Sequence, residues 1–317
     1  MRELLRFFGS EPVLVDVGAS IESPGIWKPI APASTYVGFD PDSREAASFG
    51  DGKFRRTVVV NEAVTSDPGV AEVRFHLART PSCSSTLAPD LDALSNYHFR
   101  DFFETEREAT VRAATLDAIL GRLGIDRIDW LKCDSQGTDL RIFRSLGERL
   151  RDGVLALDVE PGLIDAYRGE DLFPDTHKHL VANGFWLSRL QVKGAVRVRG
   201  ATLKVLYPDE AHRAVFAERA IRRSPGWCEA RYLRTLESLA GSAARERYAM
   251  LFVFALLDEQ PGFALDLALE FERRFGAGDW SARMRAAAMA WIGGWRATPL
   301  ATAKNWIRSL TKRGAGE

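Results

Sequence analysis

A chain of 317 residues, 46% of them hydrophobic, is long enough for one large domain or two smaller ones with a substantial core. Its 43 basic residues balance its 43 acidic residues, so the overall charge gives no support for a nucleic-acid-binding protein. Three scattered cysteines, Cys83, Cys133 and Cys228, indicate neither a disulfide framework nor a zinc site and favour a reducing compartment. Without an apolar run near the ~20 residues of a membrane span, or a signal-peptide pattern, we expect a cytoplasmic protein.

The first predicted strand covers residues 13–17 and runs into a glycine turn. In VLVDVGAS, apolar residues lead to Asp16 and Gly18, a pattern typical of a buried parallel strand that ends at a tight turn. Such strand ends form the ligand crevice of an open α/β sheet. The next predicted strand, residues 36–39, ends at Asp40, where a carboxylate suits hydrogen bonds from ribose hydroxyls.

The composition of the turn indicates which nucleotide fits it. The GxGxxG pattern of dinucleotide-binding folds is absent, and Glu22 stands where a pyrophosphate would lie. A ligand with a ribose but no phosphate fits better, and S-adenosylmethionine (SAM) is the common one. Taken alone, the stretch is interpreted equally well as an ordinary turn between a strand and a helix.

Later segments continue the alternation of strands and helices. Strands are predicted at residues 57–60, 70–77, 128–131, 154–159, 185–190 and 202–207, and helices at 41–49, 115–123, 138–146 and 176–182. The charged, aromatic stretch 96–111 is interpreted as a surface connection. From Asp209 onward, alanine, leucine and arginine recur at helical spacing. The sequence therefore predicts an α/β domain over residues 1–208 and an all-α domain over residues 209–317.

Seven motifs follow one another in a fixed order within residues 10–207. They are LVDVGAS at 14–20, GFDPD at 38–42, NEAV at 61–64, SCSST at 82–86, TLDAIL at 115–120, IDWLKCDSQGTDL at 128–140 and LDVE at 157–160. Together they resemble the FkbM-type SAM-dependent methyltransferases, and their joint order is more specific than any one motif. The resemblance implies a class I (Rossmann-like) methyltransferase fold and methyl transfer to a hydroxyl, most often of a sugar or polyketide.

On that fold the resemblance implies a set of cofactor-binding residues. The first turn would line the cofactor, Asp40 would bind its ribose, the segment after the third strand would face its adenine, and the serine-rich loop would bind its carboxylate or the acceptor. The residues are Asp16, Gly18, Ala19, Ser20, Asp40, Asn61, Glu62, Ala63, Ser84 and Ser85. For the two loop serines, hydrogen bonds to their own backbone are the plainer interpretation.

Methyl transfer to a hydroxyl also needs a group that removes a proton, or a metal that lowers the hydroxyl pKa. Asp134, at a strand end beside the cofactor crevice, is the first candidate for the base, and Asp158 and Glu160 would join it if their strands are neighbours. Such a cluster can also hold a divalent metal through oxygen ligands, although the pattern does not indicate one strongly. As alternatives, Asp134 caps a helix or bonds the amino acid part of the cofactor, and the other two acids pair with Lys132 or Arg141.

The carboxyl-terminal segment is basic and contains tryptophans. Residues 281–313 include seven basic residues and no acid. A helix of this kind can lie on an anionic membrane surface, but packing against its own domain or a partner subunit is the commoner reason for its apolar stripe.

We therefore expect a SAM-dependent O-methyltransferase that acts on a hydroxyl of a glycan, such as a surface polysaccharide or lipid-linked sugar, or of a secondary metabolite. Its partners would be that acceptor and no nucleic acid, with peripheral membrane contact and homo-oligomer formation left open. The alternative is a non-catalytic, methyltransferase-like scaffold whose helical tail mediates protein–protein interaction.

Overall fold

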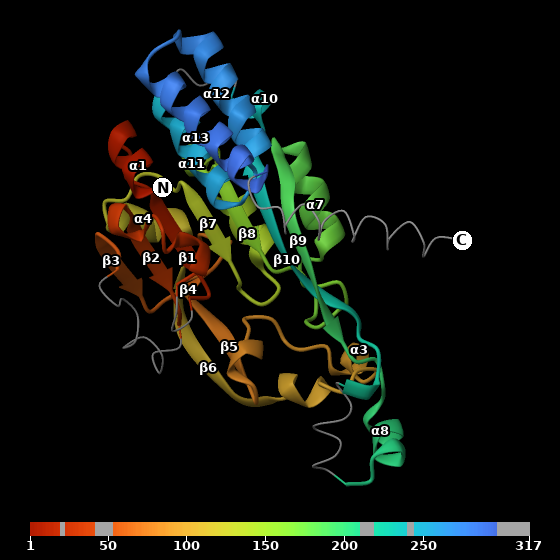
Figure 1. Ribbon diagram of the computed structural model, residues 1–317. Coiled ribbons are helices and arrows are strands. Elements are labelled where there is room, and N and C mark those ends of the chain that lie inside the picture. Colours follow the sequence, from red (N-terminus) through yellow and green to blue (C-terminus); the bar gives the residue numbers. More distant parts are fainter. Residues whose placement is uncertain (20–22, 42–52, 210–218, 240–243, 297–317) are drawn as a thin grey trace. The chain divides into compact units, whose positions relative to one another are not determined.

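The computed structural model describes residues 1–19, 23–41, 53–209, 219–239 and 244–296 (Figure 1). They fall into two compact units. One runs from Glu11 to Ser238, and the other joins Met1–Ser10 to the described residues from Leu239 onward. Because each unit has its own core, each is described by itself.

A mixed sheet of seven strands forms the centre of the larger unit. In spatial order the strands are β3 (Arg56–Val60), β2 (Thr35–Phe39), β1 (Val13–Val17), β7 (Trp130–Cys133), β8 (Ala156–Val159), β10 (Ser224–Arg234) and β9 (Phe185–Ala195). The first five are parallel, and β10 is antiparallel to both of its neighbours. This is an α/β, Rossmann-like sheet, so the predicted fold class is confirmed.

Helices cover the sheet, and a smaller sheet extends from it. The helices of this unit are α3 (Leu91–Leu94), α4 (Leu116–Arg122), α5 (Asp139–Ser145), α6 (Glu148–Gly153), α7 (Phe173–Ala182), α8 (Gly200–Leu206) and, at the end of the unit, α10 (Leu236–Leu239), with short 3-10 helices at Gly25–Trp27, Ala31–Ala33, Pro81–Cys83 and Arg100–Phe103. The second sheet contains β4 (Ala63–Val64), β6 (Thr105–Ala114) and β5 (Glu72–Ala78) in that spatial order.

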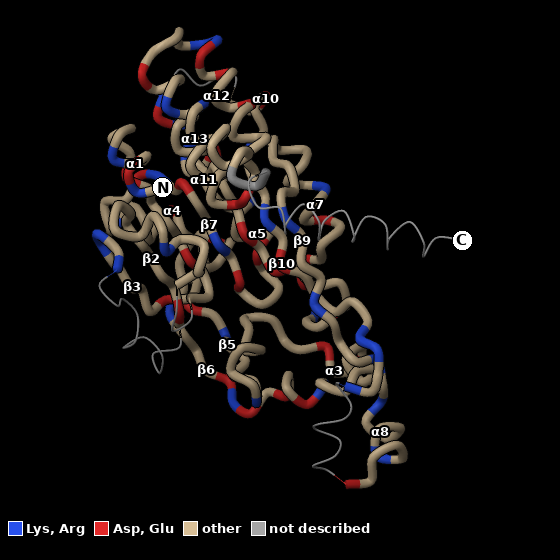
Figure 2. Tube along the Cα trace, viewed as in Figure 1, with Lys and Arg blue, Asp and Glu red and all other residues tan. Residues whose placement is uncertain are grey.

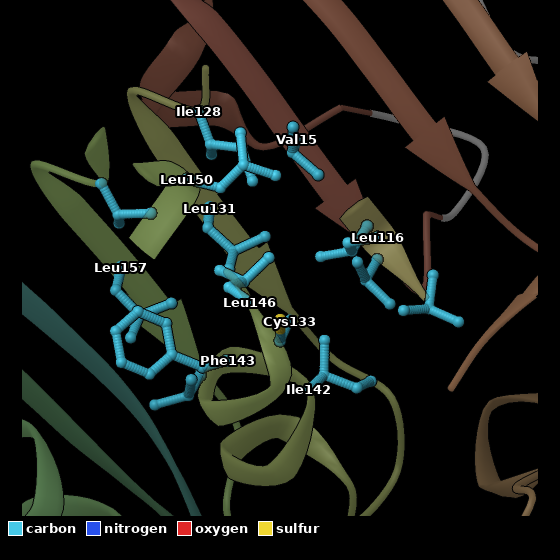
Figure 3. Close-up of a cluster of buried hydrophobic side chains, with 14 of the residues drawn as sticks. Val15, Leu116, Ile128, Leu131, Cys133, Ile142, Phe143, Leu146, Leu150 and Leu157 are labelled. Carbon is cyan, nitrogen blue, oxygen red and sulfur yellow. The ribbon is translucent and has the colours of Figure 1, made fainter. Parts of the chain in front are cut away.

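Aliphatic side chains hold helices α5 and α6 on one face of the large sheet (Figure 3). Leu131 of β7 and Leu157 of β8 are fully buried there, together with Phe143 of α5. Strands β1, β2, β7 and β8 are largely buried on both faces, which explains their apolar runs in the sequence. Cys133 lies in the same cluster, where burial raises its pKa well above the ordinary value, and it packs as a small apolar residue.

Three predictions about secondary structure are wrong. Residues predicted as a strand at 202–207 lie mainly in helix α8, where only Leu203 is buried. Residues 105–111, predicted as part of a surface connection, belong to β6, whose charged side chains are exposed. Strand β10 was not predicted, since Glu229, Arg231 and Arg234 interrupt its apolar residues. The sheet unit therefore ends at Ser238 and not at the predicted boundary after residue 208.

A buried arginine ties β10 to the neighbouring loops. The Arg234 guanidinium donates hydrogen bonds to the carbonyl oxygens of Val154, Asn183 and Arg151, at 2.7, 2.9 and 2.6 Å. Replacing it by methionine leaves these carbonyls without that donor, so we expect Arg234→Met to lower the free energy of unfolding by about 2–4 kcal/mol in urea denaturation. Arg189→Met, at an exposed position of the adjacent strand, should change it by less than ~0.5 kcal/mol. Equal urea midpoints for both variants would contradict the structural role of Arg234.

The smaller unit is helical. It contains α1 (Arg2–Phe8), α11 (Arg245–Leu257), α12 (Pro261–Phe275) and α13 (Asp279–Arg296). Helix α11 is its centre, because nine consecutive residues, Tyr248–Leu256, are buried. The predicted helical carboxyl-terminal region is thus confirmed for the described residues from Leu236 onward, but not for residues 224–234, which form β10. Residues 297–313 of the predicted basic segment lie outside the described residues. None of the helices described is long and apolar enough to cross a membrane.

Candidate functional site

The turn after β1 brings backbone from three strands into close contact. Gly18 has a φ of 75°, and the N–H groups of Gly18 and Ala19 both donate to the carbonyl of Phe39, at 3.0 and 2.9 Å. A Cβ atom at position 18 would lie 2.0 Å from the carbonyl oxygen of Asp134. Only glycine fits this turn, for conformational and steric reasons alike.

A cavity of about 490 Å³ opens at the carboxyl ends of β1, β2 and β7. Its volume is in the range of small-molecule sites. Six of the predicted cofactor residues line it: Gly18, Ala19, Asp40, Glu62, Ala63 and Ser84. The rest of the lining is Val17, Phe39, Pro41, Val64, Phe75, Pro81, Ser82, Thr86, Asp134, Ser135, Gln136 and Thr138. We call this space the cofactor cavity.

Three other predicted cofactor residues do not line the cofactor cavity. Asp16 is 1% exposed and accepts hydrogen bonds from Lys132 Nζ and the Tyr36 hydroxyl, each at 3.1 Å, so its side chain anchors Lys132. Asn61 donates its side-chain amide to the backbone oxygen of Asp40 at 3.3 Å. Ser85 donates to the backbone oxygen of Gln136 at 2.7 Å, as a loop serine that satisfies the backbone. The predicted Ser20 lies outside the described residues.

A second cavity, of about 440 Å³, adjoins the first. Ser82, Asp134 and Gln136 line both. The second cavity is walled by five aromatic side chains and contains two further carboxyl groups; these residues are Phe99, Phe102, Phe103, Tyr167, Trp227, Glu160 and Glu170. We call it the acceptor cavity. Two ligands bound in these cavities would meet at Asp134.

The sequence of residues 16–186 matches the family described as the methyltransferase FkbM domain. The match spans more than half of the chain and covers every residue that lines the cofactor cavity. The chain belongs to the FkbM methyltransferase family. No curated protein matches it. The predicted family is therefore confirmed, and the domain with the two adjoining cavities is a methyltransferase domain.

In this FkbM domain, a hydrogen bond and an ion pair hold the side chain of Asp134 between the two cavities. Gln136 donates its side-chain amide to Asp134 Oδ1 at 2.7 Å, and Lys132 Nζ lies 3.7 Å from Asp134 Oδ2. Gln136 in turn accepts from the Tyr167 hydroxyl at 3.0 Å. Gln136 also has a φ of 56°, which is uncommon for a residue with a side chain and which is found at functional turns.

Glu160 provides the most strongly shifted carboxyl group of the acceptor cavity. Burial raises its pKa from the ordinary 4.5 to about 8, and the negative charge of Asp134 adds to the shift, while Lys132 opposes it. The backbone N–H of Glu160 donates to Asp139 at 2.8 Å, and the Ser135 N–H donates to the same carboxylate at 2.9 Å. Asp139 thus ties the end of β8 to the turn that carries Asp134.

Asp158 does not join the other two acids. Its carboxylate accepts from Arg231 Nε at 2.6 Å and from the Trp130 indole at 3.0 Å, and it lines neither cavity. Asp158 therefore forms an ion pair within the sheet. The sequence offered Lys132 or Arg141 as its partner, whereas the partner in the structure is Arg231 of the unpredicted strand β10. Among the described residues no group of three or more His, Cys, Asp and Glu side chains is arranged to hold a metal ion.

Several residues of the FkbM domain that contact the cavities were not predicted. Gln136 lies within the IDWLKCDSQGTDL motif, and a polar side chain in a turn between a strand and a helix is the signal that would have found it. Tyr167 and Glu170 come from a loop, and Phe102 from a short 3-10 helix, and neither segment carries such a motif.

Proposed function

We propose that this FkbM domain is a SAM-dependent O-methyltransferase. The main support is the charge of the cofactor cavity. Among the described residues, its lining includes three carboxyl side chains, Asp40, Glu62 and Asp134, and no lysine, arginine or histidine. This lining suits a ligand with a sulfonium and an ammonium group and is unsuited to a phosphate-bearing dinucleotide.

The residues present fit the parts of SAM. Asp40, at the carboxyl end of β2, would accept hydrogen bonds from the ribose, and Phe39, Ala63 and Phe75 supply apolar surface for the adenine. When bound, SAM supplies an electrophilic methyl group whose leaving group is a neutral thioether. The protein then has to orient an acceptor hydroxyl and take its proton.

Asp134 and Glu160 differ in position and in pKa, so we assign one of these two tasks to each. Asp134 borders both cavities and would orient the acceptor hydroxyl beside the methyl group. Glu160 would act as the base, because a pKa of about 8 suits proton transfer near neutral pH better than an ordinary carboxyl does. Glu160 would then take the proton that the acceptor hydroxyl releases when it is methylated. This assignment replaces Asp134, the first candidate from the sequence, as the base.

The acceptor we propose is a hydroxyl of a glycan or of a secondary metabolite. The apolar faces of a sugar ring would pack on aromatic walls such as Phe102 and Trp227, which are 46% and 39% exposed. Its hydroxyls would meet the carboxyl groups of Glu160 and Glu170. Assays with labelled SAM and sugar or polyketide acceptors test this class.

Calorimetric titration with SAM tests the cofactor. We expect Asp40→Ala to weaken SAM binding about 10-fold to 30-fold, since it removes a charged acceptor of ribose hydrogen bonds. Glu108→Ala removes an exposed carboxylate of β6 that lines neither cavity, and it should leave the affinity unchanged. An unmodified protein that gives no heat of binding at ~1 mM SAM would overturn the proposal in favour of the non-catalytic scaffold.

Substitution of Asp134 tests the division of tasks. Asp134→Asn keeps the shape of the side chain but removes the charge beside Lys132 and Glu160. We expect kcat to fall about 100-fold while SAM still binds, because the acceptor is misoriented. The pH midpoint of the remaining activity should shift downward, since a charge that raises the pKa of Glu160 is lost. An unchanged kcat would remove Asp134 from the reaction.

A further inference from the structure

The connection between β9 and β10 gathers basic side chains at one end of this strand pair. Antiparallel pairing places Ala195, near the end of β9, opposite Ser224, the first residue of β10. We define the basic connection as the described residues 196–209 and 219–223. It carries six exposed cations against one acid, Asp209; the cations are Arg197, Arg199, Lys204, Arg219, Arg222 and Arg223. Figure 2 shows basic residues on α8 and on the connection beside it.

Helix α8 adds an apolar tip to the basic connection. Val205 is 81% exposed and Leu206 is 54% exposed, while Leu203 anchors the helix with 7% exposure. Within its unit, α8 projects beyond the ends of β9 and β10 (Figure 1). Two adjacent aliphatic side chains that stay in water contribute nothing to the core of the fold.

We propose that the basic connection docks on an anionic lipid bilayer, with Val205 and Leu206 inserted at the interface. Clustered Lys and Arg side chains are attracted to acidic headgroups, and aliphatic side chains gain from entering the boundary of the acyl chains. A soluble polyanion would engage the cations alone and leave the tip in water. The chain as a whole has equal numbers of basic and acidic residues, so its net charge adds no general attraction to anionic lipids.

The same surface borders the acceptor cavity. Gly194, Val196, Arg223 and Trp227 line that cavity at the base of the connection. A docked protein would therefore present the cavity lining at the bilayer surface, where an acceptor carried on a lipid is found. This delivery step rests on the proposed function, whereas binding to the bilayer does not.

Cosedimentation of the full-length protein with lipid vesicles tests the proposal. We expect binding to mixed phosphatidylglycerol and phosphatidylcholine vesicles at low salt, weaker binding at high salt, and little binding to phosphatidylcholine alone. Val205→Asp/Leu206→Asp and Arg197→Glu/Lys204→Glu should each lower the partition coefficient at least about 10-fold. Val181→Asp provides a matched control, because Val181 is 49% exposed on α7, which precedes the opposite end of β9. It should change partitioning less than about twofold.

Three results would overturn the proposal. They are absence of binding to the anionic vesicles, unchanged binding of the Val205→Asp/Leu206→Asp variant, and binding that inorganic polyphosphate matches in strength with no dependence on Val205 and Leu206. SAM titrations of the same samples separate this proposal from the proposed function. Val205 and Leu206 line neither cavity, so their variants should bind SAM like the parent protein.

Discussion

Replacing Glu160 by glutamine is expected to lower kcat about 1000-fold at pH 8, while SAM affinity changes less than about threefold. The side chain lines the acceptor cavity and not the cofactor cavity, so its loss removes the proton acceptor without removing a cofactor contact. Single-turnover methyl transfer with saturating SAM measures the effect. Glutamine keeps the volume of the side chain but does not accept the proton of a hydroxyl.

The pH dependence of the unmodified enzyme follows from the same group. A base must be ionised, so log kcat should rise with pH up to about 8, the pKa of Glu160, and then level off. In Glu160→Gln this rise should disappear. A Glu160→Gln enzyme that keeps the pH profile of the parent would assign the base to another group.

Glu170 provides the comparison within the same cavity. Burial raises its pKa from 4.5 to about 7, and it accepts hydrogen bonds from the backbone N–H groups of Ala166 and Tyr167. Because Glu170 shapes the cavity wall, Glu170→Gln should raise the KM for the acceptor more than it lowers kcat. If instead Glu170→Gln abolished kcat and Glu160→Gln did not, the two roles would be exchanged.

Replacing Glu160 by glutamine should raise the stability of the protein at pH 8, although it lowers the activity. The pKa of Glu160 is higher in the folded state than in the unfolded chain, so the folded state binds its proton more tightly. The contribution of Glu160 to the free energy of unfolding is fully present below pH ~4 and is lost as pH rises toward 8. Removing the ionisable group should therefore raise the melting temperature at pH 8, by on the order of 2–5 °C. A gain in stability with a loss of activity is typical of a catalytic carboxylate.

Much of the sheet could be predicted from the sequence because its parallel strands are buried on both faces. The segments that form β1, β2, β7 and β8 are short apolar runs ended by an acid or glycine. Strands β6 and β10 gave no such signal. Strand β6 exposes its charged side chains to solvent, and β10 carries half-buried or buried charged residues that bond to neighbouring elements, so charged residues interrupt the apolar pattern of both.

The part of the candidate site that lies at strand ends was also predictable from the sequence. Gly18, Asp40, Asp134 and Glu160 each follow or end a recognisable strand, and the topology of a parallel sheet brings such positions to one edge. Asp16, which also ends such a strand, does not line the cofactor cavity, because its side chain points to Lys132, and sequence position does not show side-chain direction. The aromatic wall of the acceptor cavity could not be predicted, since Phe102, Tyr167 and Trp227 come from distant segments without a shared spacing.

Substitution of Gly18 should have the largest effect on cofactor binding. Gly18→Ala places a methyl group 2.0 Å from the Asp134 carbonyl oxygen, and a φ of 75° is unfavourable for alanine. Both the turn after β1 and the turn after β7 line the cofactor cavity, so the structure can relieve this clash only by separating them. We expect SAM affinity to fall at least about 100-fold.

Gly121→Ala is the matched control for this substitution. Gly121 lies in helix α4, where an added methyl group would meet nothing within 4 Å, and alanine is the better helix former, so the protein should be slightly stabilised. Circular dichroism separates a local effect from unfolding: Gly18→Ala should keep its secondary structure and melt at a lower temperature than Gly121→Ala. If Gly18→Ala bound SAM with the parent affinity, the two turns would not need their close approach, and the cofactor would have to bind away from the ends of β1 and β7.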